Sequence, residues 1–261
     1  MKVYIATDLE GISGVTVWEQ TRDRTTQLYQ QARCLLTREV NAAVQGCLHG
    51  GATEVIVLDG HGGGFNFVPE EMHTGATWVT GPGRPDAHCG LDASCNAAML
   101  VGYHAMAGTP NAVLCHTQSS LGGNRYWYNG RESGEIAQSA ICCGHHGVPV
   151  VMVAGDEAAC REAREFLGHG IVTVSVKKGL GITCCEMIAP SRAWPMVREA
   201  AAEALARVGQ VKPYQIAVPI QARIQFGSKE IADKAGCTLS KRVDDTMFER
   251  TMESPLEIYR F

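Results

Sequence analysis

The feature that most constrains this chain is a pair of short apolar runs separated by one long helical repeat. Residues 2–7 and 55–58 are apolar and rich in β-formers, whereas residues 29–49 repeat apolar side chains at helical spacing. Gly50 and Gly51 then end the helical stretch. A strand, a helix and a second strand in this order form a βαβ unit, whose strands are parallel. We therefore predict an α/β fold with a mostly parallel sheet sandwiched by helices.

More elements follow in the first two thirds of the chain. Further strands are predicted at 97–102, 112–115, 125–128 and 148–154, and further helices at 133–143 and 156–167. Asn129 and Gly130 predict a hairpin turn after the third of these strands, and Asp156 is expected to cap the last helix.

The pattern changes beyond about residue 175. A helix predicted over 191–208 precedes two-residue alternations at 215–226 and 238–247, which are typical of antiparallel strands with one solvated face. We expect a metal-binding catalytic α/β domain over residues 1–175 and a smaller α+β domain over residues 176–261. The smaller domain is expected to serve oligomerisation and closure of the pocket.

The bulk composition excludes several classes of protein. The formal net charge is only −4 and no run of Lys or Arg occurs, so a nucleic-acid partner is not expected. No stretch approaches the roughly 18 apolar residues of a membrane helix, and the first residues do not resemble a signal peptide. The eleven cysteines include no CxxC pair and are expected to be reduced. We expect a cytoplasmic protein.

Metal-competent residues follow the predicted strands at their carboxyl ends. Ligands of open α/β sheets bind in the crevice beyond those ends, where side chains distant in sequence converge. Glu135, in the first turn of a predicted helix, could join them from one side. The strand-end residues are Asp8, Glu10, Asp59, His61, His104 and His116.

The residue types favour a divalent metal. Asp8 and Glu10 are two positions apart on an extended segment, so both carboxylates can face one point, where they repel unless a cation or a shared proton intervenes. Carboxylates with imidazoles are the ligands expected for zinc or another borderline ion. Asp59 is more plausibly a support for His61 or a helix cap than a ligand. For the segment of Asp8 and Glu10, a solvated acidic turn remains the alternative. For the glycine-rich segment around His61, the alternative is a phosphate-binding loop.

Other catalytic signatures are missing. There is no GxSxG elbow for a serine hydrolase and no HExxH helix for a zincin. Cys115 and His116 are adjacent, and neighbours on a strand face opposite ways, which argues against a Cys-His dyad between them.

Several separated motifs, in order and across most of the chain, resemble the zinc-dependent D-aminopeptidase family of the DppA type. The motifs are VYIATDLEGISG at 3–14, EVIVLDGHG at 54–62, LVGYHAMAGTP at 100–110, LCHT at 114–117, GRESGE at 130–135 and VPVVMVAGD at 148–156. Residues 64–95 match little, and we expect them to line the entrance or the substrate pocket.

The resemblance implies two Zn²⁺ ions per subunit and a homo-oligomer, a ring-shaped decamer. By resemblance, Asp8 bridges the two ions and His116 is a catalytic residue rather than a ligand. The implied metal ligands are Asp8, Glu10, His61, His104 and Glu135.

The predicted function is hydrolysis of the N-terminal residue of short peptides by metal-activated water. The preference for D-amino acids rests on the resemblance alone. Two alternatives remain open at this point. One is a dinuclear amidohydrolase acting on a small amide or lactam, and the other is a non-enzymatic, ring-forming metal-binding protein.

Overall fold

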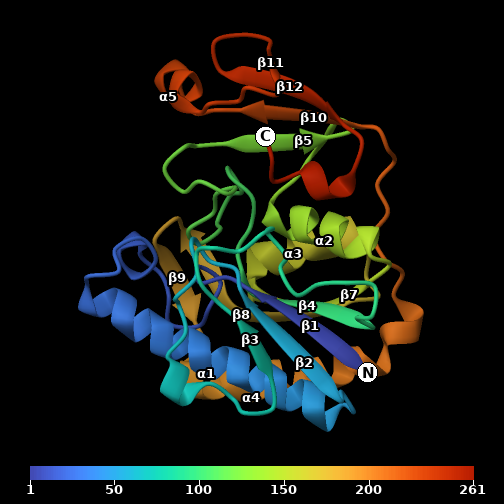
Figure 1. Ribbon diagram of the computed structural model, residues 1–261. Helices are drawn as coiled ribbons and strands as arrows, with labels where there is room; N and C mark the ends of the chain where they lie inside the picture. The colour runs from blue at the N-terminus through green and yellow to red at the C-terminus, as the bar shows by residue number, and fades with distance from the viewer.

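Seven strands form the larger sheet of the computed structural model, which describes residues 1–261 (Figure 1). Their order is β3-β2-β1-β4-β7-β8-β9, and every neighbouring pair is parallel except β8 and β9. The mostly parallel α/β prediction is confirmed. The strands are β1 (Lys2–Thr7), β2 (Glu54–Asp59), β3 (Thr77–Val79), β4 (Ala97–Tyr103), β7 (Val150–Asp156), β8 (Val172–Gly181) and β9 (Cys184–Met187).

Helices cover both faces of this sheet. The helices α1 (Gln27–His49) and α4 (Pro190–Ala206) pack on one face, and α2 (Glu135–His145) and α3 (Glu157–Leu167) lie on the other (Figure 1). Alternate residues of β1 join separate cores, Ile5 with α1 and α4, and Tyr4 with α2. Burial on both faces explains why the central strands read as continuous apolar runs.

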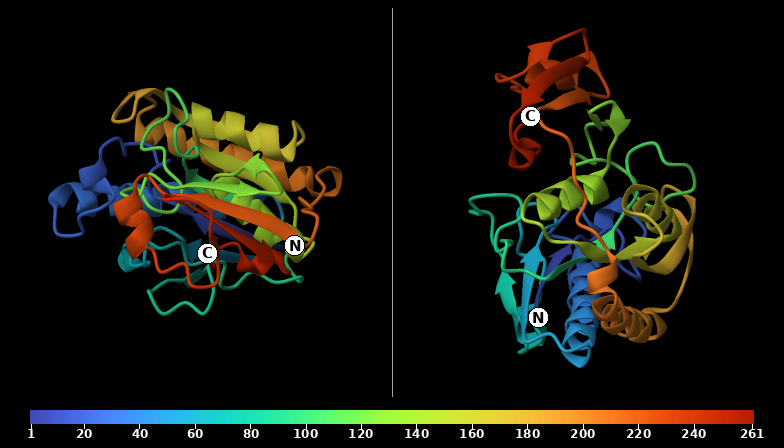
Figure 2. Two further views of the ribbon diagram at one scale, coloured as in Figure 1. Left: turned by 90° about the horizontal axis from the view of Figure 1, so that it is seen from above. Right: turned by 90° about the vertical axis from the view of Figure 1, so that its right-hand side faces the viewer.

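A second, antiparallel sheet stands beyond α2 (Figures 1 and 2). Its inner face packs Tyr128, Ile220 and Phe248 into the same core as Ile136 of α2. The predicted hairpin turn is confirmed, because Asn129 and Gly130 both have positive φ between β5 and β6. In sheet order its strands are β11 (Lys241–Arg242), β12 (Met247–Met252), β10 (Ile220–Gln225), β5 (Arg125–Tyr128) and β6 (Arg131–Glu132).

Residues after the expected boundary at residue 175 contribute strands to both sheets. That position lies inside β8, and α4 packs against α1 beneath the larger sheet. The hairpin of β5 and β6 comes from the first part of the chain, but its strand β5 pairs with β10 of the second sheet. The role of residues 176–261 in oligomerisation and pocket closure stays a prediction.

One predicted strand is wrong, and another is only partly formed. Residues 112–115 form no strand, because Asn111 and Leu114 adopt positive φ while Val113 and Leu114 remain apolar core residues of a loop. Residues 238–247 are mostly exposed and form only the two-residue strand β11, which pairs antiparallel with β12, and the longer strand β12 begins at Met247. The remaining helices are α5 (Lys229–Lys234) and the 3-10 turns η1 (Trp18–Gln20), η2 (Pro69–Glu71), η3 (Val208–Gln210) and η4 (Pro255–Glu257). No helix of the structure combines the length and apolar character that a membrane span requires.

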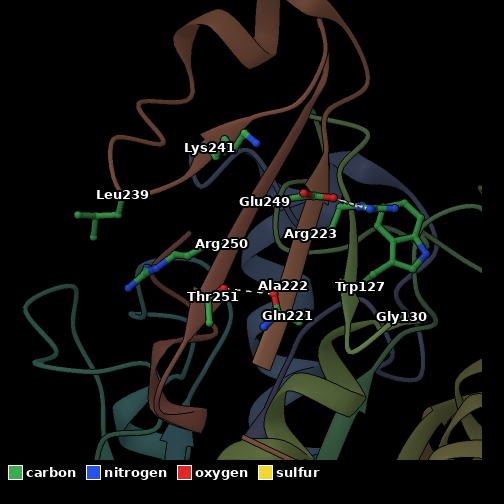
Figure 3. A pocket seen from close by; sticks show the side chains of 10 residues that line it. All are labelled: Trp127, Gly130, Gln221, Ala222, Arg223, Leu239, Lys241, Glu249, Arg250 and Thr251. Carbon is green, nitrogen blue, oxygen red and sulfur yellow. Dashed lines mark hydrogen bonds and ion pairs between the residues drawn. The ribbon is translucent and has the colours of Figure 1, made fainter. Parts of the chain in front are cut away.

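The outer face of the second sheet holds a groove of about 720 Å³ (Figure 3). Two of its charged side chains are paired across neighbouring strands, Arg223 of β10 with Glu249 of β12, as Figure 3 shows. The hydroxyl of Thr251 donates a hydrogen bond to Oε1 of Gln221, at 3.2 Å. None of the predicted metal ligands lies in this groove.

Candidate metal centre

The turn after β1 carries Asp8 and Glu10, and both side chains are buried. The Asp8 N–H donates to the Val101 carbonyl at 2.9 Å and the Gly11 N–H to the Gly102 carbonyl at 2.7 Å, which ties the turn to the end of β4. A Cβ at position 11 would collide with the carbonyl of Tyr103, so only glycine fits there. The two carboxylates are therefore held by a rigid backbone.

A buried lysine supports the same turn from below. Lys177 of β8 is 2% exposed, and its Nζ donates to the carbonyls of Glu10, Ile12 and Val15 at 2.6–2.9 Å. The buried Glu39 of α1 also supports the turn, because it accepts hydrogen bonds from the N–H and the hydroxyl of Ser13. Sequence reasoning missed both residues, because an isolated lysine or glutamate gives no sign of burial.

His61 lies in the turn after β2 and faces both carboxylates. Its Nδ1 is 2.9 Å from Asp8 Oδ1 and 3.0 Å from Glu10 Oε2, while its Nε2 is 2.9 Å from the Thr21 carbonyl. Because the Thr21 carbonyl can only accept a hydrogen bond, Nε2 carries the proton. The Nδ1 of His61 is therefore the nitrogen available to a metal.

Asp59 does not touch His61 directly. Its carboxylate accepts hydrogen bonds from the backbone and side-chain N–H groups of Asn66, at 2.8 and 2.6 Å. The Asn66 amide also donates to the His61 carbonyl at 2.7 Å. Asp59 thus shapes the His61 turn through Asn66.

His104 and Glu135 approach Asp8 from its other side. His104 Nε2 is 3.2 Å from Asp8 Oδ2 and 3.5 Å from Glu135 Oε1, and His104 Nδ1 is 2.9 Å from the Ala105 carbonyl. Glu135 lies in the first turn of α2, as predicted, although the helix begins at Glu135 itself rather than at residue 133. Asp8 therefore presents Oδ1 to His61 and Oδ2 to His104.

His116 lies directly on this cluster. Its ring stacks on His104 with centroids 4.0 Å apart, and its Nε2 is 3.7 Å from Glu135 Oε1. Its Nδ1 is 2.8 Å from the Leu114 carbonyl, which leaves Nε2 free. The edge of Trp18 contacts His116 at a centroid distance of 5.8 Å. The structure thus brings together all six residues that the sequence singled out for metal binding and catalysis.

The electrostatics of the cluster call for cations. Burial opposes charge on His61 and His104, but the neighbouring carboxylates outweigh it and raise the pKa of both imidazoles well above the ordinary value. Burial likewise opposes ionisation of Asp8, yet the neighbouring imidazoles of His104 and His61 hold its pKa well below the usual range. The carboxylates of the cluster therefore favour positive charge beside them.

The donor atoms fit a metal. Asp8 Oδ2, Glu10 Oε2 and His104 Nε2 are buried side-chain atoms without a hydrogen-bond partner, and such atoms are rare unless a ligand satisfies them. Ligand atoms of Asp8, Glu10 and His104 lie within 4.8 Å of one another, and so do those of His104, His116 and Glu135. Nitrogen and oxygen donors of this kind suit zinc.

A cavity of about 420 Å³ opens over the cluster. Residues 64–95, expected to line the entrance or the pocket, contribute Arg84, Ala87 and His88 to its wall. Arg22 and Tyr259 line it from other parts of the chain and were not predicted, because only the folded loops bring them there. The volume lies towards the small end of ligand cavities, which span about 300–1,000 Å³.

Buried carboxylates and imidazoles that face a cavity at the carboxyl edge of an α/β sheet define this protein as a metal-dependent hydrolase. The family model for D-aminopeptidase, peptidase M55, matches residues 1–261. The chain belongs to the D-aminopeptidase family and is a metallo-aminopeptidase by class.

A sequence match and a structure match, both from Bacillus subtilis, agree with this family. A D-aminopeptidase is 35% identical over 215 residues, which are 82% of this chain and 77% of the relative. A solved structure described as the Zn-dependent D-aminopeptidase DppA, a self-compartmentalizing protease, is 30% identical with a TM-score of 0.93. That match covers 100% of this chain and 94% of the DppA chain.

Proposed function

We propose that this chain is a dinuclear zinc aminopeptidase that removes the N-terminal residue, of the D series, from short peptides. The observation that carries the proposal is the position of Asp8, whose two buried oxygens face separate sets of donors. The similarity to a Zn-dependent D-aminopeptidase supports zinc and the D preference. The small cavity supports a short peptide as substrate.

In this proposal Asp8 is shared by two metal positions. His61 and Glu10 would hold one ion with Asp8, and His104 and Glu135 would hold the other with Asp8. When bound, two zinc ions supply Lewis acidity that acidifies the attacking water and polarises the scissile carbonyl. The carbonyls of Thr21 and Ala105 hold the distal nitrogens of the two histidines and so fix both rings.

His116 is proposed to transfer protons rather than hold metal. Its Nδ1–H donates to the Leu114 carbonyl, so its Nε2 can donate a proton to the leaving amine or a hydrogen bond to the developing oxyanion. The alternative role is visible in the structure, since Nε2 lies close enough to Glu135 to share a metal. The two roles differ in whether zinc is lost with the side chain.

The variant His116→Ala distinguishes these roles. We expect a loss of turnover of about 10²–10⁴-fold, the usual contribution of a positioned acid or base, with zinc content equal to that of the wild type. Steady-state kinetics with metal analysis of the same preparation measures both. A variant that loses zinc would assign His116 to the ligands instead.

We also propose that the chain assembles as a homodecamer in the cytoplasm. Support for assembly comes from the self-compartmentalizing protease that it resembles. Support for the location comes from its eleven cysteines, all of them free, which suit a reducing compartment. Light scattering of the purified protein tests the assembly and should give ten times the mass of the chain.

A substrate panel tests the proposed reaction. Matched D- and L-aminoacyl amides, each with a free or an acetylated amino terminus, are offered to the zinc-loaded protein. We expect hydrolysis of the free D-aminoacyl amides only. Hydrolysis of the acetylated compounds would favour a small-amide hydrolase, and no hydrolysis of any compound would contradict an enzymatic role.

A further inference from the structure

Two arginines without acidic partners line the cavity above the metal cluster. Arg22 follows η1, and Arg84 lies between β3 and β4. Neither forms an ion pair with a carboxylate, whereas the carboxylates of Asp8, Glu10 and Glu135 are each paired with a histidine. The two arginines of this cavity therefore form no ion pairs with its carboxylates.

Both guanidinium groups are held in place and keep free donors. Arg22 donates to the hydroxyl and the carbonyl of Ser120, at 2.9 and 2.6 Å, and lies 3.7 Å over the Trp18 ring. Arg84 donates to the carbonyls of Asp59 and Gly62, at 2.6 and 3.0 Å. A guanidinium has five N–H groups, so each arginine retains three for another acceptor.

The geometry points to a carboxylate-binding subsite: we propose that Arg22 and Arg84 bind the C-terminal carboxylate of the peptide whose N-terminal residue is removed. This inference rests on the proposed aminopeptidase function and names its substrate class, dipeptides and similarly short free-acid peptides. A fixed, planar guanidinium is the group best suited to a carboxylate, because it offers parallel N–H donors without further loss of side-chain freedom. A cavity of about 420 Å³ brings both ends of such a peptide within one site.

Arg24 provides a matched control. It is two residues from Arg22, donates to the Gly64 carbonyl at 2.8 Å and forms no ion pair. It does not line the cavity, however. An effect of general surface charge would appear in variants of all three arginines, whereas a carboxylate subsite involves only Arg22 and Arg84.

The test compares three dipeptide substrates with the zinc-loaded wild type and with Arg22→Gln, Arg84→Gln and Arg24→Gln. The substrates are D-alanyl-D-alanine, its C-terminal amide, and D-alanyl-D-aspartic acid α-amide, which carries its carboxylate on a side chain. We expect kcat/KM of the wild type to favour the free acid over its amide by at least about tenfold, the effect of a charged hydrogen bond. In Arg22→Gln and Arg84→Gln this ratio should fall towards one, mainly through KM, whereas Arg24→Gln should retain it.

Each other outcome has a defined meaning. Equal kcat/KM of the wild type for acid and amide would overturn the subsite, and so would an equal fall of the ratio in Arg24→Gln. If the aspartyl amide reacts as well as the free acid, the subsite takes a side-chain carboxylate and the C-terminal assignment is wrong.

Two further measurements keep folding and function separate from this inference. Zinc content checks that Arg84→Gln leaves the His61 turn intact, and Arg84→Lys, which retains the cation, should recover part of the acid-to-amide ratio. If the wild type hydrolyses none of the three substrates, the proposed function fails. Calorimetric binding of the dipeptide acid and amide to the metal-free protein then still tests the subsite, which predicts tighter binding of the acid.

Discussion

Charged side chains are paired and exposed on one sheet, whereas on the other they are buried and incompletely hydrogen-bonded. On the five-stranded sheet, Arg223 pairs with Glu249 and Arg125 with Glu132, and these side chains are 27–49% exposed to solvent. At the carboxyl edge of the parallel sheet, Asp8 and Glu10 are buried and retain oxygens without a hydrogen-bond partner. A surface pair satisfies its own charges, whereas a buried group without a partner is tolerated only where something else satisfies it. The second arrangement therefore indicates a site, and the predictions below test that difference.

The largest effect is expected for Asp8→Asn. The substitution keeps the shape of the side chain but removes the charge shared between the two proposed metal positions. We expect loss of bound zinc and a fall in kcat/KM on the order of 10³-fold or more, since metal activation is worth several kcal/mol. Elemental analysis and steady-state kinetics measure the two effects. Wild-type zinc content in this variant would remove Asp8 from the ligand set.

Loss of the buried lysine beneath the metal turn should have the next largest effect. Lys177→Met leaves the carbonyls of Glu10 and Val15 without their donor, in a region that water does not reach. We expect the free energy of unfolding to fall by about 3 kcal/mol or more, with weaker zinc binding. Lys178→Met, at the exposed neighbouring position, is the control and should change neither. Urea unfolding measures the difference.

A buried glutamate should make the stability of the metal-free protein depend on pH. Burial raises the pKa of Glu162 from 4.5 to about 7, and its carboxylate accepts a hydrogen bond from the Met106 N–H at 2.7 Å. Because the folded pKa lies above the unfolded value, this group's contribution is full below pH 4.5 and is lost as the pH rises to about 7.

The variant Glu162→Gln isolates this effect. Between pH 5 and pH 8.5 the wild type should lose about 2–3 kcal/mol more of its unfolding free energy than the variant does. Denaturant titrations of both metal-free proteins at the two pH values provide the comparison. Parallel pH profiles would show that Glu162 is ionised throughout.

The smallest effect is expected on the second sheet. In Glu249→Gln the ion pair with Arg223 is weakened, but both side chains are about half exposed. We expect less than about 1 kcal/mol of lost stability, with unchanged zinc content and turnover. A large loss of zinc here would contradict the distinction between the two sheets.

The residues of the metal cluster were predictable to different degrees. Asp8, Glu10, His61 and His104 follow parallel strands, so the topology alone brings them to one edge. Glu135 was placed by family resemblance, because a helix start does not reveal which site it faces. His116 was expected after a strand, yet it lies in a loop where Leu114 and Gln118 have positive φ, a conformation that apolar periodicity does not report.

The features of the fold and the cavity that could not be predicted depend on contacts between distant parts of the chain. The pairing of β5 with β10 joins residues about a hundred positions apart, and no local pattern encodes that choice. For the same reason, Arg22, Arg84 and Tyr259 could not be assigned to the cavity before the loops were placed. Local patterns define elements and their order, whereas loop packing decides what surrounds the metals.

The central claim is that two zinc ions share Asp8 and are required for aminopeptidase activity. Titration of zinc into metal-free protein, with hydrolysis of a D-aminoacyl amide followed at each step, tests it most directly. The account predicts activity that rises to a maximum at two equivalents of zinc per chain. Full activity without zinc, or a maximum at one equivalent, would contradict it.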